Sequence, residues 1–364
     1  MIPRHSILFA LLTALLLIAL ALPVGHAAPP RQEGDATAAE PTAAAERDAA
    51  TEAPGGVRIE GFNADSSDLH LVDPFDPATR GTVQERMTRG ARRTAPNSLL
   101  HNMTWVTYYG RPNVDIMGIL GEFDVEGLAD RLQEQTDAYD EANGPDVGVQ
   151  PAFELVHGMA LCCENPDQSY LAYLDDETVE TYIQVAQERG FQVVLDVQVG
   201  NLTPQEAMAR AFKWLEYDNV HLALDPEFAM REPDQERPGR PPGYVTAQEV
   251  NEVQRAMRDY MVENDLPGRR VLILHQFLLT MIQNKEDLEQ VYKVDLVVTA
   301  DGFGTVWQKV GKYNSFIYDD VEYSGFKLFY RWDDPVMTEA ESMGAALHPG
   351  HIYMDFTPNV IIYQ

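Results

Sequence analysis

Cysteine is nearly absent from this 364-residue chain, which has only two, Cys162 and Cys163, side by side. One adjacent pair cannot provide the disulfide framework that holds small exported domains together. Nor does the pair have the partner spacing of a zinc site. A strained vicinal disulfide is one interpretation, and two reduced thiols beside a loop is the simpler one. The fold must therefore be stabilised by a hydrophobic core.

Positive charge is also scarce. The chain has 27 Lys and Arg against 57 Asp and Glu, which gives a formal net charge of −30 and an isoelectric point near 4.5. Nucleic acids and anionic membranes repel such a surface, so neither is expected as a partner. A glycine-rich phosphate loop is missing after the first apolar run of the main domain, which counts against an open doubly wound sheet.

Only one apolar run is long, Ile7–Leu22, and Arg4 is the single fixed positive charge before it. Gly25 and Ala27 supply small residues at −3 and −1 of a cleavage site, so residues 1–27 have the three parts of a secretory signal peptide. A membrane anchor is the alternative, because the run approaches spanning length. The cleavage site and the lack of stop-transfer charges favour removal. We expect a secreted or cell-envelope protein with no stable membrane insertion after signal cleavage.

Composition divides the remaining chain into three segments. Residues 28–56 are mostly Ala, Pro, Glu and Asp, and they cannot bury enough surface to offset their chain entropy, so we expect a disordered tether. Residues 57–100 combine scattered apolar residues with a basic patch, which indicates a partly ordered arm. Residues 101–364 are dense in apolar runs, and their length is typical of one α/β barrel domain.

Eight short apolar runs recur through residues 101–364. They are apolar on both faces, as buried parallel strands are. The runs are Thr104–Tyr109, Gln150–Val156, Phe191–Val197, Val220–Asp225, Arg270–His275, Asp295–Ala300, Gly325–Tyr330 and Asn359–Gln364. Most gaps between them have a helical pattern. This alternation predicts an α/β fold of one domain, a (β/α)8 TIM barrel.

Helix signals support the same fold. Capping boxes begin at Thr203, Thr246 and Thr338, each with Glu three residues on. Because the printed sequence ends on the eighth predicted strand, the eighth helix of the barrel is missing. We expect the arm at 57–100 to cover the gap that it leaves.

Polar side chains end nearly every predicted strand. The carboxyl ends of TIM-barrel strands carry the reactive groups, so this end is the candidate site. The candidate catalytic residues are Glu227, Asp225, Asp196, Glu154 and His275. The candidate substrate-binding residues are Tyr108, Tyr109, Gln198, Gln276, Asp301, Tyr330, Trp332 and Lys327. Aromatic faces beside carboxylates suit a sugar ring, although aromatic residues also pack under loops.

The segment Ala223–Phe228 (ALDPEF) carries the sharpest local signal. In an extended strand, Asp225 and Glu227 would point to the same face, about 6.6 Å apart along the chain. Pro226 disfavours a helical conformation at Asp225. In the alternative interpretation, Asp225 caps the next helix and Glu227 forms an ion pair with Arg231.

An Asp-x-Glu at the end of the fourth strand resembles the signature of family 18 chitinases and, more loosely, of family 25 lysozymes. The resemblance implies that Glu227 is the general acid and that Asp225 steadies the acetamido group of the substrate or the developing charge. The chitinase motif has two further aspartates upstream, where this chain has Val220 and Ala223. The domain is also similar to uncharacterised secreted bacterial proteins, a likeness that implies no activity.

Lys327 and His275 are the two basic candidates. Lys327 lies in the middle of a predicted strand. The structural interpretation, an ion pair with Asp225, Asp196 or Glu154 or else an outward-facing side chain, is preferred to a Schiff-base amine. His275 is a second acid or base, a hydrogen-bond donor or a neutral core residue.

Two further readings use His275 with other residues. Together with the acidic strand ends it would bind a divalent metal, and with His157 it would form a two-histidine phosphodiesterase site. The spacing favours neither, so no metal and no cofactor are expected.

These observations favour an exported carbohydrate-active barrel, a glycoside hydrolase acting on a cell-surface or environmental glycan, with Glu227 as general acid. The expected partner is a glycan or another small-molecule substrate. The alternative is a glycan-binding or envelope-associated barrel without catalysis. A further alternative is a phosphodiesterase or metal-dependent hydrolase. The dense polar strand ends favour the enzyme, whereas the two absent aspartates favour the binding protein.

Overall fold

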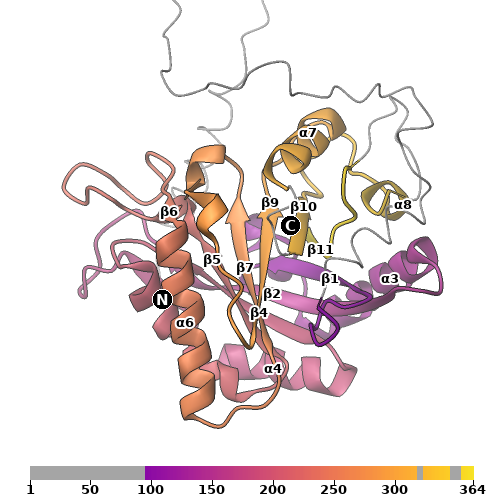
Figure 1. The fold of residues 1–364 in the computed structure, drawn as a ribbon, viewed down its shortest axis with the longest axis horizontal. Coiled ribbons are helices and arrows are strands. Elements are labelled where there is room, and N and C mark those ends of the chain that lie inside the picture. Colours follow the sequence, from indigo (N-terminus) through magenta and orange to yellow (C-terminus); the bar gives the residue numbers. More distant parts are fainter. Residues whose placement is uncertain (1–94, 318–322, 345–353) are drawn as a thin grey trace, which may run out of the picture.

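The computed structural model describes residues 95–317, 323–344 and 354–364 (Figure 1). The predicted signal peptide, the tether and residues 57–94 of the arm lie outside the described residues. Across the ranges that are described, no helix is both long and apolar enough to cross a membrane.

Eight parallel strands form a closed barrel. Going round it, they follow the order β1, β2, β4, β5, β7, β9, β10 and β11, and β11 pairs with β1. Their bounds are Met103–Gly110, Gly148–Ala160, Gln192–Gln198, Val220–Asp225, Arg270–Gln276, Val294–Ala300, Tyr323–Leu328 and Val360–Tyr363. Helices lie between the strands, as Figure 1 shows. The predicted TIM barrel is confirmed, and each predicted strand overlaps one of these eight.

Two strands differ from their predicted bounds in ways that affect the site. β2 runs to Ala160 because its far end pairs with the short antiparallel strand β3, Leu171–Tyr173. β10 ends at Leu328, two residues before the predicted end. Lys327 therefore lies at the carboxyl end of its strand and not in the middle, which brings it to the level of the other strand ends.

Six α-helices are described. They are α3 (Val125–Asn143), α4 (Asp176–Arg189), α5 (Pro204–Ala209), α6 (Ala247–Glu263), α7 (Val306–Phe316) and α8 (Glu339–Ser342). The three predicted capping boxes are present at Thr203, Thr246 and Thr338, and Thr305 with Gln308 forms a fourth. The short α8 lies against α3, where Gln135 donates to Glu339 at 2.6 Å.

Smaller elements complete the described parts. Strands β6 (Val245–Thr246) and β8 (Ile282–Gln283) pair with each other outside the barrel. Six short 3-10 turns lie in loops: η1 (Asp115–Met117), η2 (Ile119–Gly121), η3 (Phe212–Glu216), η4 (Pro226–Phe228), η5 (Leu279–Met281) and η6 (Lys285–Asp287). Among them, η4 shapes the candidate site directly.

Alternation along each strand separates two cores. Outward side chains such as Leu222 and Leu272 pack under the helices, and inward side chains such as Ala223 and Ile273 fill the barrel. Toward the amino ends of the strands the inner core is mostly apolar, with His221 and Asp295 as buried polar members. Because side chains alternate between the two faces of a strand, successive residues of one strand belong to different cores.

Residues 95–100 close the amino end of the barrel. Leu100 is 1% exposed and packs with the inner core, and the backbone N–H of Leu99 donates to Asp295 at the start of β9. The Ser98 hydroxyl donates to the same carboxylate at 3.0 Å. Residues 95–100 of the predicted arm therefore close the amino end of the barrel, and the expectation that the arm covers the gap of the eighth helix rests on residues outside the described ranges.

Candidate functional site at the carboxyl end of the barrel

Charged side chains gather on the inner face of the barrel at the carboxyl ends of the strands. Glu154 and Asp196 are fully buried there, His275 is 1% exposed and Lys327 is 4% exposed. Four different strands, β2, β4, β7 and β10, carry these side chains, and the loop after β9 adds Asp301. The structure thus brings together the charged residues that the strand ends predicted.

His275 lies between two carboxylates. Its Nε2 is 3.0 Å from Oε1 of Glu154, and its Nδ1 is 3.2 Å from Oδ2 of Asp301. Burial alone would lower the pKa of the imidazole, but the contacts with Asp301 and Glu154 outweigh it and raise the pKa of His275 to about 10. At neutral pH the ring is therefore a cation with both nitrogens protonated, which suits a hydrogen-bond donor and not a base.

Lys327 forms its ion pair with Asp301, at 3.1 Å. The prediction of an ion pair was right, but the three predicted partners were wrong. Register explains the difference, because Phe326 pairs with Ala300 and the next residue of each chain is then adjacent. The ammonium also lies 3.6 Å from the centre of the Tyr109 ring.

The charge state of Lys327 bears on the Schiff-base reading. Burial opposes the ammonium, but the carboxylates of Asp301, Glu154 and Asp225 outweigh burial, so the pKa of Lys327 is raised. A Schiff-base lysine needs a lowered pKa to be nucleophilic. The environment therefore supports a structural cation.

Asp301 is the shared anion of this network. Burial favours its neutral form, but Lys327 and His275 outweigh that effect and hold its pKa below the ordinary value. Its other oxygen accepts a hydrogen bond from the N–H of Gly302 at 2.6 Å. Asp301 is therefore ionised, and its side chain is 13% exposed.

Asp196 has the opposite environment. Its Oδ2 accepts a hydrogen bond from the Tyr109 hydroxyl at 3.0 Å, and Oδ1 is buried with no hydrogen-bond partner. Burial, together with the charges of Asp225 and Glu154, outweighs the nearby cations and raises the pKa of Asp196 to about 8. This group is therefore a protonated acid at neutral pH.

Asp225 and Glu227 do not share an extended strand. β5 ends at Asp225, and Pro226–Phe228 form the 3-10 turn η4. Pro226 fixes its own backbone angle at the first position of this turn, which turns Glu227 away from the strand direction. The prediction of two carboxylates on one strand face is thus wrong in its geometry.

The alternative interpretation of this segment is half right. The Oδ1 of Asp225 accepts from the backbone N–H of Glu227 at 3.0 Å and so caps the turn. Arg231, however, binds Glu249 at 2.7 Å and not Glu227. The Glu227 carboxyl is therefore not tied up in the ion pair that this interpretation proposed.

The turn still keeps the two carboxyl groups coupled. Burial raises the pKa of Glu227 well above its ordinary value, and the charges of Asp225 and Asp301 raise it further. Burial likewise raises the pKa of Asp225. Taken as whole residues, Glu227 is partly exposed and Asp225 is 7% exposed, so Glu227 lies nearer to solvent than Asp225.

Three of the predicted binding residues make structural contacts. Gln198 accepts from the N–H of Ala160 at 2.7 Å and secures the end of β2. Gln276 accepts from the buried ammonium of Lys285 at 2.6 Å, on the outer side of β7. Trp332 packs against Phe303 and Phe329 in the loops above β9 and β10.

The tyrosine pair Tyr108 and Tyr330 lies elsewhere. The two residues line a cavity outside the barrel wall, described below, with Tyr108 on the outer face of β1. Thr107 was not predicted, yet its hydroxyl donates to Oε2 of Glu154 at 3.0 Å. Its position, two residues from Tyr109 on the same face, is the signal that would have found it.

The described geometry does not support the hypotheses of a divalent-metal site or of a two-histidine phosphodiesterase site. Within the described ranges, no group of three or more His, Cys, Asp or Glu side chains has the arrangement of a metal site. His157 packs edge-on against Tyr173, and burial lowers its pKa to about 4. It contacts a residue of β3 and not His275.

Comparisons with known proteins add little beyond the fold. No protein-family model and no curated protein matches the sequence. Two crystal forms of 2,3-dimethylmalate lyase, a PEP mutase/isocitrate lyase superfamily member, are similar in structure, with 10% identity and TM-scores of 0.39 and 0.38; each alignment covers 78% of this chain, and 81% and 78% of those chains. Alpha-galactosidase I from Mortierella vinacea has 10% identity and a TM-score of 0.32, covering 58% of this chain and 48% of its own. Likenesses this remote carry no information on a reaction.

Proposed function

We propose that this protein is an exported glycoside hydrolase whose reaction takes place at the carboxyl end of the barrel, with Glu227 as the general acid. One observation carries the proposal: Glu227, a partly exposed residue in the turn directly after β5, has the pKa of its carboxyl group raised well above the ordinary value, beside a second carboxyl group. Glycosidases need an acid that is still protonated near neutral pH.

The residues around Glu227 fit that role. Asp225 holds the turn that presents Glu227, and its charge favours the protonated form of the acid. Asp301 is ionised and partly exposed, and its carboxylate can accept a hydrogen bond from a substrate hydroxyl. Since Lys327 and His275 hold Asp301 on one oxygen, the position of this acceptor is fixed before a substrate arrives.

Two half-buried aromatic side chains beyond the strand ends agree with a sugar substrate. Phe303 and Trp332 lie in the loops after β9 and β10 and pack on the buried Phe329. Such faces bind the apolar side of a pyranose ring while carboxyl groups bind its hydroxyls. Export rests on the signal-like pattern of residues 1–27.

The test is a hydrolysis screen of the purified protein against chitin, peptidoglycan and plant and algal glycans. The chain as printed is compared with Glu227→Gln, which keeps the shape and removes the acid, and with Glu188→Gln, an exposed carboxylate on α4. Turnover that is lost only in Glu227→Gln supports the proposal. Equal turnover in all three removes Glu227 from the mechanism, and binding without turnover favours the non-catalytic glycan-binding barrel.

A further inference from the structure

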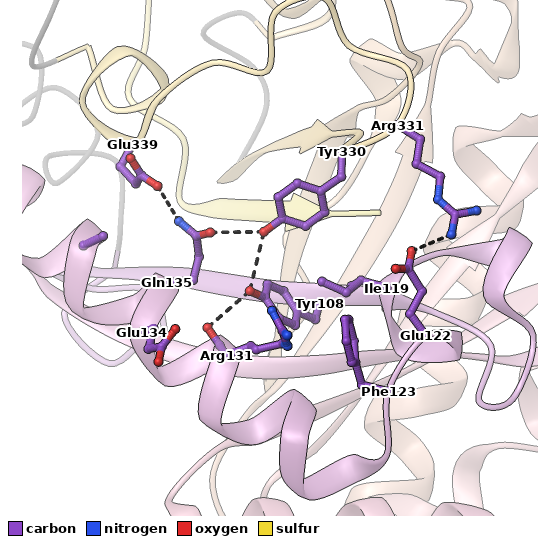
Figure 2. A pocket seen from close by; sticks show the side chains of 11 residues that line it. Tyr108, Ile119, Glu122, Phe123, Arg131, Glu134, Gln135, Tyr330, Arg331 and Glu339 are labelled. Atoms are coloured by element: carbon purple, nitrogen blue, oxygen red, sulfur yellow. Dashed lines mark hydrogen bonds and ion pairs between the residues drawn. The ribbon is translucent and has the colours of Figure 1, made fainter.

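A recess lies outside the barrel wall, away from the charged cluster. It has a volume of about 490 Å³ and lies between α3 and the loop that follows β10 (Figure 2). Its size is within the range of small-ligand sites. It is distinct from the charged cluster, because Tyr108 on its floor points outward from β1 while Tyr109 points into the barrel.

One wall of this recess is a fixed chain of hydrogen bonds. The hydroxyl of Tyr330 donates to Oε1 of Gln135 at 3.1 Å, and the amide of Gln135 donates to Glu339 at 2.6 Å. The Tyr108 hydroxyl donates to the carbonyl oxygen of Arg131 at 3.2 Å, as Figure 2 shows. The Tyr330 ring stacks on Tyr363 with centroids 4.9 Å apart, yet it is still 39% exposed. The wall therefore presents a rigid aromatic surface bordered by polar groups.

The opposite wall combines an aromatic ring with charges. Phe123 is 38% exposed, and the guanidinium of Arg131 lies 4.0 Å from the centre of its ring. Arg331 pairs with Glu122 at 3.0 Å at the rim. Within the described part of the chain, neither Arg131 nor Glu134 has an ion-pair partner of opposite charge, so both can bind a ligand.

These features select one kind of ligand. Two exposed aromatic rings fit the flat apolar sides of a sugar ring, and carboxylate, amide and guanidinium groups match its hydroxyls as acceptors and donors. Three glutamates and two arginines line the recess, so it has no excess of positive charge that would bind a phosphate or sulfate group. We propose that this recess is a second carbohydrate site, which binds a neutral pyranose unit of a glycan chain.

This inference does not require the barrel to be catalytic, so the two can be tested apart. Binding is measured by isothermal titration calorimetry with cellohexaose, chitohexaose, xylohexaose and mannohexaose. All proteins carry Glu227→Gln, so that no probe is hydrolysed. In that background, Tyr330→Ala and Phe123→Ala each remove one aromatic wall, and Trp307→Ala removes an aromatic ring on α7 that is 65% exposed.

We expect at least one hexaose to bind, and Tyr330→Ala and Phe123→Ala to weaken that binding by about tenfold while Trp307→Ala leaves it unchanged. Phe123→Ala protects the test against misfolding, because Phe123 is on the surface whereas Tyr330 stacks on a buried ring. Absence of binding by every probe overturns the inference, as does binding that neither variant weakens. Wall-dependent binding, together with no hydrolysis of any glycan by the chain that retains Glu227, would leave this inference standing and the proposed function refuted.

Discussion

Tyr108 and Tyr109 are neighbours on β1, yet their hydroxyl groups belong to different sites. The hydroxyl of Tyr109 donates to Asp196 inside the barrel, and that of Tyr108 donates to the backbone of Arg131 under the outer recess. One strand thus forms part of both proposed binding regions, which lie on its two faces. A ligand in the recess would be separated from the charged cluster by the barrel wall itself.

Lys327 is predicted to stabilise the fold through its ion pair. Lys327→Met keeps the apolar stem and leaves Asp301 with one cation fewer in a buried network. Removing one partner of a buried pair costs about 3–5 kcal/mol. Lys213→Met is the control, since the ion pair of Lys213 with Asp176 is exposed and worth at most about 1 kcal/mol. Urea denaturation measures both, and equal small losses would show that the buried pair is not structural.

Asp196 is predicted to make stability depend on pH. Its pKa is raised to about 8 in the folded protein, against about 3.9 in an unfolded chain. Between these values the folded state holds a proton that the unfolded state has lost, so stability falls as pH rises, by up to about 1.4 kcal/mol per pH unit. Asp196→Asn keeps an acceptor for Tyr109 and has no proton to lose.

The free energy of unfolding is measured at several pH values between about 4.5 and 8, because this range lies between the pKa of Asp196 in the unfolded chain and its pKa in the folded protein. The difference between Asp196→Asn and the unaltered protein should move in favour of the variant as pH rises. A difference that stays constant with pH would mean that Asp196 is ionised in the folded state.

Leu100 is predicted to be part of the barrel core, although it comes before the first strand. It is 1% exposed among inner-core residues, so Leu100→Ala should cost about 2–5 kcal/mol. The neighbouring Leu99 is 38% exposed and provides a matched control. If both alanine variants melt at the same temperature, the amino end of the barrel does not depend on this segment.

A mature protein that begins at Ala28 is expected from the small-residue cleavage site, and intact-mass measurement of the exported protein tests this prediction. A mass that retains residues 1–27 would indicate an anchor.

Deleting residues 28–56 should leave the melting temperature nearly unchanged, because these residues lack core-forming side chains. A loss of several degrees would mean that the tether packs on the barrel.

The sequence predicted the barrel because buried parallel strands produce apolar runs that do not depend on distant partners. It predicted the set of charged strand ends for the same reason, since parallel strands bring their carboxyl ends to one edge. It did not predict which of these side chains pair. Lys327 meets Asp301 because of the register between β9 and β10, and register is a relation between strands that neither strand contains alone.

Local backbone choices account for the other differences. Successive residues of a strand lie on opposite faces of it. Tyr108 and Tyr109, which were both candidates for one site, are therefore on different sides of β1. At Asp225 an extended strand and a capped turn were both open, and Pro226 with the Asp225 cap settles the segment as η4. The outer recess could not be predicted, because it depends on how α3 meets the loop after β10.

The last prediction separates the roles of Glu227 and Asp225 by pH. If Glu227 donates the proton to the leaving oxygen, activity is lost as pH rises through its pKa, so that pKa sets the alkaline limb of the rate profile. Glu227→Gln should lower turnover by at least about 100-fold at every pH, because the donor is gone. Asp225→Asn removes a neighbouring negative charge that helps to raise the pKa of Glu227. That pKa should then fall, and the alkaline limb of kcat/KM should move to lower pH while the fold is kept.

Glu188→Gln on the outer surface of α4 serves as the control and should change neither turnover nor the position of the limb. The Asp225 cap needs its own control, because the variant could also alter the turn that presents Glu227. An asparagine side chain still offers an oxygen to the backbone N–H of Glu227, so the turn should be kept. If the variant nevertheless disturbs the turn, kcat falls but the pH at which the alkaline limb lies does not change. A limb that stays in place in Asp225→Asn would show that the charge of Asp225 does not contribute to the raised pKa of Glu227.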